Sequence, residues 1–251
     1  MRADWQYRTS TVLFTAGQFV AAVLDFAAIL VLFSRVQALA GWSLYQVLFL
    51  YGTAGLAFGL GDLFVSPVDR AGLHIKAGSF DQFLLRPVGP LLQLTCEEFA
   101  MRRVGKLVQP AATLAIAVIK LHLVWTPLRI GVLVETLVSG TAIFSGVWII
   151  TSALAFWTVE TQEVANAFTY GGGFATQYPL DVLGSWLRRT LLFVPLAFVN
   201  YLPATWLLGR PDALGLPSWA RFTSPVVALA GLVLAGFVWR AGIRHYRSTG
   251  S

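Results

Sequence analysis

The sequence predicts an all-α membrane protein with six transmembrane helices, and three observations support this fold class. Hydrophobic residues make up 57% of the chain and charged residues only 12%, whereas soluble domains carry roughly 25% charged residues. The mean hydropathy is +0.69. The apolar residues also occur in long blocks, and about 20 apolar helical residues are needed to cross a bilayer core of about 30 Å.

The apolar blocks define the expected spans. The first block continues from Thr11 to Phe33, which is longer than the 7–15-residue apolar core of a cleaved signal peptide, so we expect a retained first span. Pro127 marks a tight turn between the third and fourth spans. Hydropathy places five of the spans at about Thr11–Phe33, Leu44–Val65, Leu107–Val124, Ile130–Trp157 and Phe222–Trp239.

The fifth span has two interpretations. Hydropathy alone favours Thr190–Leu208 as the fifth span and leaves Val164–Leu180 at the membrane–water interface. Alternatively, Val164–Leu180 crosses the membrane, and Thr190–Leu208 enters the outer leaflet and turns back. Pro195 and Pro203 fit the second interpretation, because broken helices are tolerated at membrane depth where protein buries them. Both interpretations give six spans in one membrane domain, 1–251.

The distribution of positive charge predicts the orientation. The net charge is +6, and 11 of the 18 Lys and Arg residues lie in the N-terminus, the 66–106 stretch and the C-terminal tail. With six spans these three segments lie on one side, which the positive-inside rule assigns to the cytoplasm. We therefore expect a multi-pass protein of the bacterial inner membrane with both termini cytoplasmic. The sequence has no basic stripe with interleaved aromatic residues, which would be the sign of a nucleic-acid partner.

The 66–106 stretch contains a candidate for a short cytoplasmic helix, Ser79–Arg86. Ser79 and Gln82 have the spacing of a capping box, and Pro87 disfavours helix at the residue before it. This helix either docks in the groove of a partner or rests on the bilayer surface. It would present an apolar face and two charges: Phe80, Phe83 and Leu84 on the face, with Asp81 and Arg86 beside it.

Two stretches of sequence resemble the ABC-2 type permease family. Tyr178-Pro179-Leu180 is followed by Trp186-Leu187 and by Pro195, 16 residues after the first proline, and this resembles the segment after the fifth helix of such permeases. Gly78–Leu91 resembles the G-x-x-D-x-x-L-x-R-P signature of one bacterial branch, and Gly242–Tyr246 resembles the tail of that branch. The resemblance covers nearly the whole chain.

The resemblance implies a function and a set of partners. It implies the permease subunit of an ATP-binding cassette exporter of a drug-like, cationic or lipid-like molecule. This subunit would pair with a second permease, identical or homologous, and sit on two ATPase subunits that bind ATP and Mg²⁺. The Ser79–Pro87 segment becomes a coupling helix between the second and third spans. Tyr178, Pro179, Trp186, Pro195 and Pro203 become a re-entrant element before the sixth span, which favours the second interpretation of the fifth span.

The residues themselves argue against chemistry on this chain. No phosphate-binding G-x-x-x-x-G-K-[ST] motif, metal-binding H-E-x-x-H or Cys/His cluster, or nucleophile elbow occurs in the sequence. We expect no catalytic residues, no metal site and no bound cofactor, with ATP hydrolysed by a partner. The alternative function is a secondary transporter or channel that acts without ATP, although such proteins commonly carry inverted repeats and no repeat is visible here.

Several polar residues and glycines lie within the expected spans. Asp25 in the first span is either a cation-contacting group in the translocation path or a neutral or paired residue that holds two helices together, because a charge at this depth is costly. Asp62 is expected to reach water, and Glu135 and Lys120 to reach the outer interface. Gly55 and Gly59 have the small-xxx-small spacing that permits close helix contact.

Overall fold

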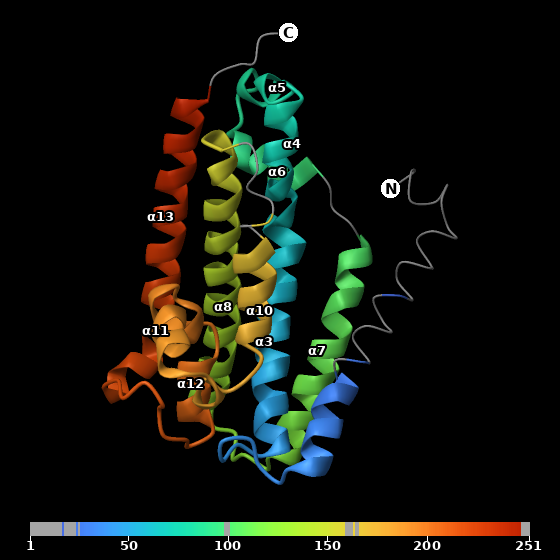
Figure 1. Cartoon of the computed structure of the whole chain (residues 1–251), viewed down its shortest axis with the longest axis vertical. Coiled ribbons are helices and arrows are strands. Elements are labelled where there is room, and N and C mark those ends of the chain that lie inside the picture. The colour runs from blue at the N-terminus through green and yellow to red at the C-terminus, as the bar shows by residue number, and fades with distance from the viewer. Residues whose placement is uncertain are drawn as a thin grey trace.

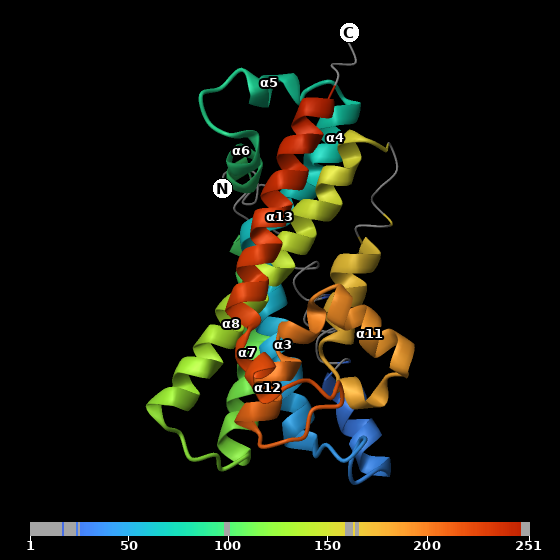
Figure 2. The same ribbon diagram turned by 90° about the vertical axis from the view of Figure 1, so that its left-hand side faces the viewer.

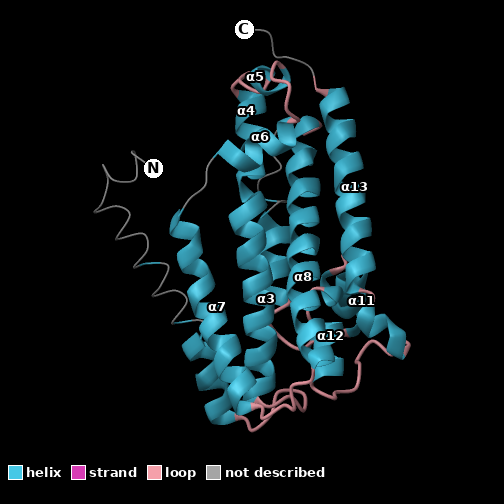
Figure 3. Ribbon diagram, turned by 180° about the vertical axis from the view of Figure 1, so that it is seen from behind, coloured by secondary structure: helices cyan, strands magenta, loops and turns pink. Residues whose placement is uncertain are grey.

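The computed structural model describes residues 17, 24, 26–97, 101–158, 163 and 166–246. Most of the expected first span, including Asp25, lies outside the described residues, and Phe26–Arg35 at its end is helical. Regular structure in the described part of the chain is helical, apart from one bridge between Leu39 and Trp42. The all-α fold class is confirmed for these residues (Figures 1 and 3).

The longest element is a continuous helical rod from Leu44 to Lys76. It begins as α3 (Leu44–Val65), tightens to the 3₁₀ segment η1 (Ser66–Arg70) and continues as α4 (Ala71–Lys76). The 33 residues of the rod span about 50 Å, at 1.5 Å per residue. Since the bilayer core is about 30 Å thick, the rod extends well beyond one membrane surface.

The rod is followed by short helices and then by two long ones. The helices α5 (Asp81–Leu84) and α6 (Pro90–Glu97) lie at one end of the bundle, and α7 (Met101–Lys120) returns along α3 (Figure 1). The helix α8 (Pro127–Ala153) then packs on α3 and α13 and ends in η2 (Leu154–Phe156). Pro127 occupies the first turn of α8, where its missing N–H costs nothing, so the predicted turn is confirmed.

The region before the last helix is built from short pieces. These are η3 (Ala167–Gly171), which is π-helical, α10 (Gly172–Ala175), η4 (Leu180–Val182), α11 (Ser185–Phe193), η5 (Leu196–Phe198), α12 (Tyr201–Leu207) and η6 (Ser218–Phe222). The chain from Ser185 to Leu207 bends by 81° between Phe193 and Leu196. This bend is the geometry of either a broken span or a re-entrant loop. The final helix, α13 (Ser224–His245), runs beside α8 toward the α5 end of the bundle (Figure 2).

Three described helices are long and apolar enough to cross a membrane: Leu44–Lys76, Pro127–Phe156 and Ser224–His245. The bent pair would make four. They match the second, fourth and last expected spans, so the chain is a multi-pass membrane protein. The expected third span coincides with α7 as far as Lys120, but α7 is not among the three, and the count of six stays a prediction.

The interior contains two clusters of buried side chains. The larger cluster surrounds α3 and includes Phe49, Phe144, Trp148 and Tyr201. The smaller one lies at the α5 end and joins Phe80, Phe156 and Trp239. Outward-facing residues of α13, such as Leu229 and Phe237, are largely exposed, as expected for side chains that contact lipid.

Candidate functional site

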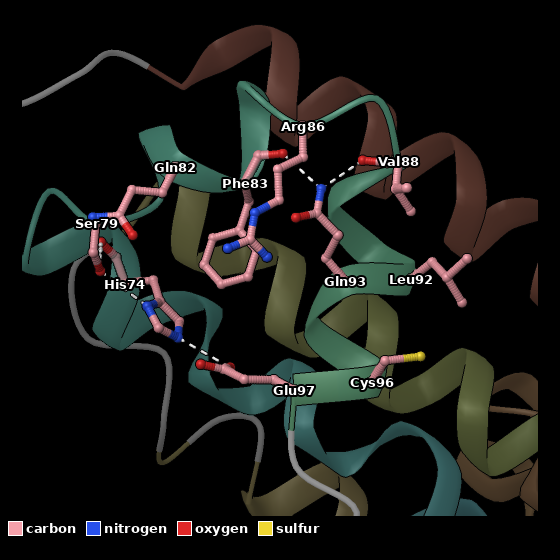
Figure 4. Close-up of a pocket in the computed structure, with 10 residues that line it drawn as sticks. All are labelled: His74, Ser79, Gln82, Phe83, Arg86, Val88, Leu92, Gln93, Cys96 and Glu97. Atoms are coloured by element: carbon pink, nitrogen blue, oxygen red, sulfur yellow. Dashed lines mark hydrogen bonds and ion pairs between the residues drawn. The ribbon is translucent and has the colours of Figure 1, made fainter.

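The segment between α4 and α6 carries polar side chains that contact one another at one end of the bundle (Figure 4). Its helix is shorter than predicted, because α5 covers only Asp81–Leu84 and follows Phe80 without a side-chain cap. The predicted capping box is wrong: the Ser79 hydroxyl instead lies 2.9 Å from Nδ1 of His74. Ser79 therefore ties the segment to α4.

His74 also connects α4 to α6. Its Nε2 lies 3.2 Å from a carboxylate oxygen of Glu97, the last residue of α6. The imidazole ring packs edge-on against Phe83, with 4.9 Å between ring centroids. One side chain thus contacts α4, α5 and α6 together.

Gln93 fixes the loop that follows α5. Its amide Nε2 donates to the carbonyl of Phe83 at 2.7 Å and to that of Val88 at 2.5 Å. These two hydrogen bonds attach the residues on both sides of Pro87 to α6.

An open cavity of about 570 Å³ lies beside Gln93. Its walls include His74, Gln82, Arg86, Gln93, Cys96 and Glu97 (Figure 4).

Phe80 anchors the segment to the transmembrane helices. Its side chain is 0% exposed and packs on Phe156, with 5.2 Å between centroids, and on Tyr246, with 5.1 Å. Phe156 in turn packs on Trp239 of α13 at 5.3 Å. Phe80, which the sequence assigned to a partner-facing surface, therefore belongs to the chain's own interior.

The surface of the segment is apolar at its tip. Leu85 is 85% exposed, and Leu84 and Val88 are also exposed. Arg86 and Pro87 are exposed beside them. In contrast, the carboxylate of Asp81 lies beside the Tyr246 hydroxyl. Burial and, to a smaller extent, this carboxylate raise the pKa of that tyrosine. Arg86 is therefore the charge that the tip presents.

Polar contacts link the rod to its neighbours just below this segment. Asp69 accepts hydrogen bonds from Trp148 Nε1 at 3.2 Å and from Ser152 at 2.8 Å, both on α8. Asp62 pairs with Lys106 of α7 at 2.9 Å. The expectation that Asp62 simply reaches water is wrong, because its residue surface is 3% exposed.

The residues predicted for a re-entrant element gather at the opposite end of the bundle. Pro195 stands in the 81° bend, Pro179 precedes η4 and Pro203 is buried in α12. Tyr178 packs against Phe174. Trp186 on α11 is 72% exposed.

Two polar clusters that sequence reasoning missed hold this region in place. Asp181 accepts hydrogen bonds from Trp42 at 2.9 Å and Tyr201 at 3.0 Å. The buried amide of Asn200 donates to the carbonyls of Leu50 at 2.9 Å and Thr176 at 3.1 Å. Neither cluster has a local motif, since its members are far apart in the chain.

The geometry provides no assembled centre for chemistry among the described residues. No group of three His, Cys, Asp or Glu side chains that could hold a metal ion occurs in the searched part of the chain. The described residues instead form two structural features. Polar and aromatic contacts hold the 79–88 segment at one end of the bundle, and hydrogen bonds of Asp181 and Asn200 hold the bent segment at the other. Together with the long apolar helices, they define a multi-pass membrane protein without an assembled catalytic centre in the described residues.

The comparison with protein families agrees with this class. A family model described as ABC-2 family transporter protein matches residues 19–250. The chain belongs to this family, and the resemblance seen in the sequence is confirmed. Membership makes the chain a membrane transport subunit of the permease kind. Neither the comparison with curated proteins nor that with solved structures gave a match.

Proposed function

We propose that this chain is the permease subunit of an ATP-driven exporter and that residues 79–88 are its docking element for a separate ATPase. Two such permeases, identical or homologous, would enclose the path of a small molecule, and two ATPase subunits would bind and hydrolyse ATP with Mg²⁺. The observation that carries the proposal is the construction of the element: an exposed tip at Leu84, Leu85 and Val88, and a buried anchor at Phe80.

The buried Phe80 connects the exposed tip to the transmembrane helices and could transmit a movement of the tip to them. A push on the tip reaches Phe80 and then Phe156 in η2, which follows α8, and Trp239 in the last third of α13. The hydrogen bonds of Asp69 carry the same displacement between the rod and α8. Because packed side chains transmit strain with little compression, the element would move these helices together.

The opposite end supports a role in controlling access. The bend between Phe193 and Leu196 fits a re-entrant element on the outer side of a bacterial inner membrane, with the α5 end and both termini in the cytoplasm. On this interpretation, residues near 164–180 form the fifth span. The family resemblance favours a drug-like, cationic or lipid-like substrate.

The orientation can be tested with the protein's own thiol. Cys96 is the single cysteine of the chain, is exposed and lies in the wall of the cavity beside α5. A membrane-impermeant maleimide should leave it unlabelled in intact cells and label it in inverted vesicles. Bound ATPase should slow the labelling. Labelling in intact cells would contradict the proposal.

The docking role can be tested by co-purification of the chain with a candidate ATP-binding cassette ATPase expressed in the same cells. Leu85→Asp places a charge at an apolar contact without disturbing the fold, since the side chain is 85% exposed. We expect this variant to lose the ATPase and its stimulated activity. Trp219→Asp, an exposed site at the other end, is the matched control. ATP-independent flux in liposomes that contain the chain alone would favour a secondary transporter instead.

A further inference from the structure

A second cavity lies at the end of the bundle opposite α5, where α8 begins. It has a volume of about 580 Å³ and is lined by Pro127, Leu128, Gly131, Val132, Glu135 and Phe222. Known ligand pockets have volumes of roughly 300–1,000 Å³. In Figure 2 the first turns of α8 lean away from the rest of the bundle.

The chemistry of the lining is unusual for a membrane surface, because Glu135 is its one charged residue. One carboxylate oxygen accepts a hydrogen bond from Ser139 at 2.9 Å. The other oxygen has no hydrogen-bond partner among residues 26–97, 101–158 and 166–246. A carboxylate beside apolar walls within a span is costly unless it finds a partner, so the cavity favours a cation.

Phe222 gives the cavity a fixed aromatic wall. Its ring packs against Trp206 of α12, with 5.3 Å between centroids in an edge-on arrangement, and this contact restricts its rotation. An aromatic face attracts ammonium groups, most strongly where water is scarce. Glu135 and Phe222 thus offer two kinds of contact to the same cation.

The surroundings of the cavity indicate where the ligand comes from. Glu135 lies about 12 Å along α8 from its start, at 1.5 Å per residue, which places it near the boundary between lipid headgroups and acyl chains. Further along the two helices that adjoin the cavity, Val138 of α8 and Val226 and Leu229 of α13 are exposed. A ligand with an ammonium group and long apolar chains matches both parts.

We propose that this cavity binds the ammonium headgroup of an aminophospholipid, with phosphatidylethanolamine as the type. The ammonium donates hydrogen bonds to Glu135 and faces the Phe222 ring, and the acyl chains lie along Val138, Val226 and Leu229. An anionic lipid such as phosphatidylglycerol lacks the donor cation and meets the Glu135 charge. This site shares no residue with the 79–88 segment, so the lipid proposal and the proposed docking function can be tested independently.

The test uses the full chain without its ATPase, purified from nanodiscs that contain equal amounts of phosphatidylethanolamine and phosphatidylglycerol. Native mass spectrometry counts the lipids that remain bound. The wild type should retain phosphatidylethanolamine in clear preference. Glu135→Gln should weaken this retention about tenfold, as expected for loss of one charge-assisted hydrogen bond. Glu163→Gln, at an exposed carboxylate outside the cavity, should retain the lipid as the wild type does.

A second variant fills the cavity while keeping the carboxylate. A Cβ built on Gly131 meets no atom within 4 Å and Gly131 lines the cavity, so Gly131→Leu adds an apolar side chain to the cavity wall. It should also lose the lipid. Gly236→Leu, at an equally open glycine of α13, is its control.

Three outcomes would overturn the proposal. These are equal retention of the two lipids by the wild type, unchanged retention by both cavity variants, and preferential Glu135-dependent binding of added tetraphenylphosphonium over phosphatidylethanolamine. The last outcome would assign the cavity to an organic cation.

Discussion

The ammonium group of Lys106 lies 2.9 Å from the Asp62 carboxylate and joins α7 to the α3 rod. Lys106→Met would leave a buried carboxylate without this cation, which costs about 1–3 kcal/mol of stability. The value is below that of a fully buried pair because 34% of the Lys106 side chain is exposed and solvent screens the attraction. We expect a lower melting temperature in detergent. The Asp62→Asn, Lys106→Met double variant should recover part of the loss, and an additive loss would contradict the coupling.

Close contact between α3 and α7 depends on Gly52. A Cβ at this position would lie 2.7 Å from the backbone nitrogen of Leu114, and backbone atoms cannot turn aside as a flexible side chain can. Gly52→Ala should therefore lower the stability by about 1–3 kcal/mol, the usual cost of overpacking, as measured by thermal unfolding. Gly131→Ala has open space and should be neutral or slightly stabilising. Similar melting temperatures for the two variants would show that the helices separate easily.

The amide of Asn200 should be irreplaceable by a carboxylate. Its Nδ2 faces the carbonyls of Leu50 and Thr176 and the hydroxyl of Thr53, and Asn200 is 0% exposed. Asn200→Ala loses these donors and should destabilise the protein by about 1–3 kcal/mol. Asn200→Asp should be more harmful, because it places acceptor oxygens against acceptors. Melting temperatures of the two variants provide the measurement, and a more stable Asp variant would show that the amide is reversed.

Alkaline pH should loosen the 79–88 segment through Tyr246. Burial and the neighbouring Asp81 raise the pKa of Tyr246 above its ordinary value of 10.0. The unfolded chain therefore loses this proton at a lower pH than the folded chain. The contribution to stability is complete below pH 10 and is lost as the pH rises through the raised pKa.

This alkaline effect can be measured by limited proteolysis of the 79–88 segment between pH 9 and 11. Tyr246→Phe keeps the ring contact with Phe80 but cannot ionise, so it should remove the Tyr246 part of the pH dependence. Identical pH profiles for the two proteins would exclude this role of the tyrosine.

The sequence predicted the helices that consist of unbroken apolar residues. The predicted span Leu44–Val65 has the same bounds as the observed helix α3, and α8 begins at Pro127 as expected. These elements depend on local composition and on proline stereochemistry, which act over a few residues. The region from 167 to 222 was harder to predict, because its bends depend on tertiary partners such as Leu50 and Thr176 for Asn200.

A short helix lies within the predicted Ser79–Arg86 segment, but its internal contacts differ from those predicted. A spacing rule assigned Ser79 to a helix cap, whereas His74 competes for its hydroxyl. An amphipathic pattern assigned Phe80 to the outer face, yet Phe156 and Tyr246 cover it. A one-dimensional pattern marks an apolar face, but it cannot tell a partner protein from the chain's own last helix.

The rod from Leu44 to Lys76 couples the movements of the two ends of the molecule, because one continuous helix reaches both. With a length of about 50 Å, a tilt of about 10° around its centre would carry each end by about 4 Å in opposite directions. Leu50 near one end holds Asn200 of the bent segment, and His74 near the other holds Ser79 beside the exposed tip. Narrowing on one side of the membrane and widening on the other would then be a single rigid-body event, and no separate signal between them is required.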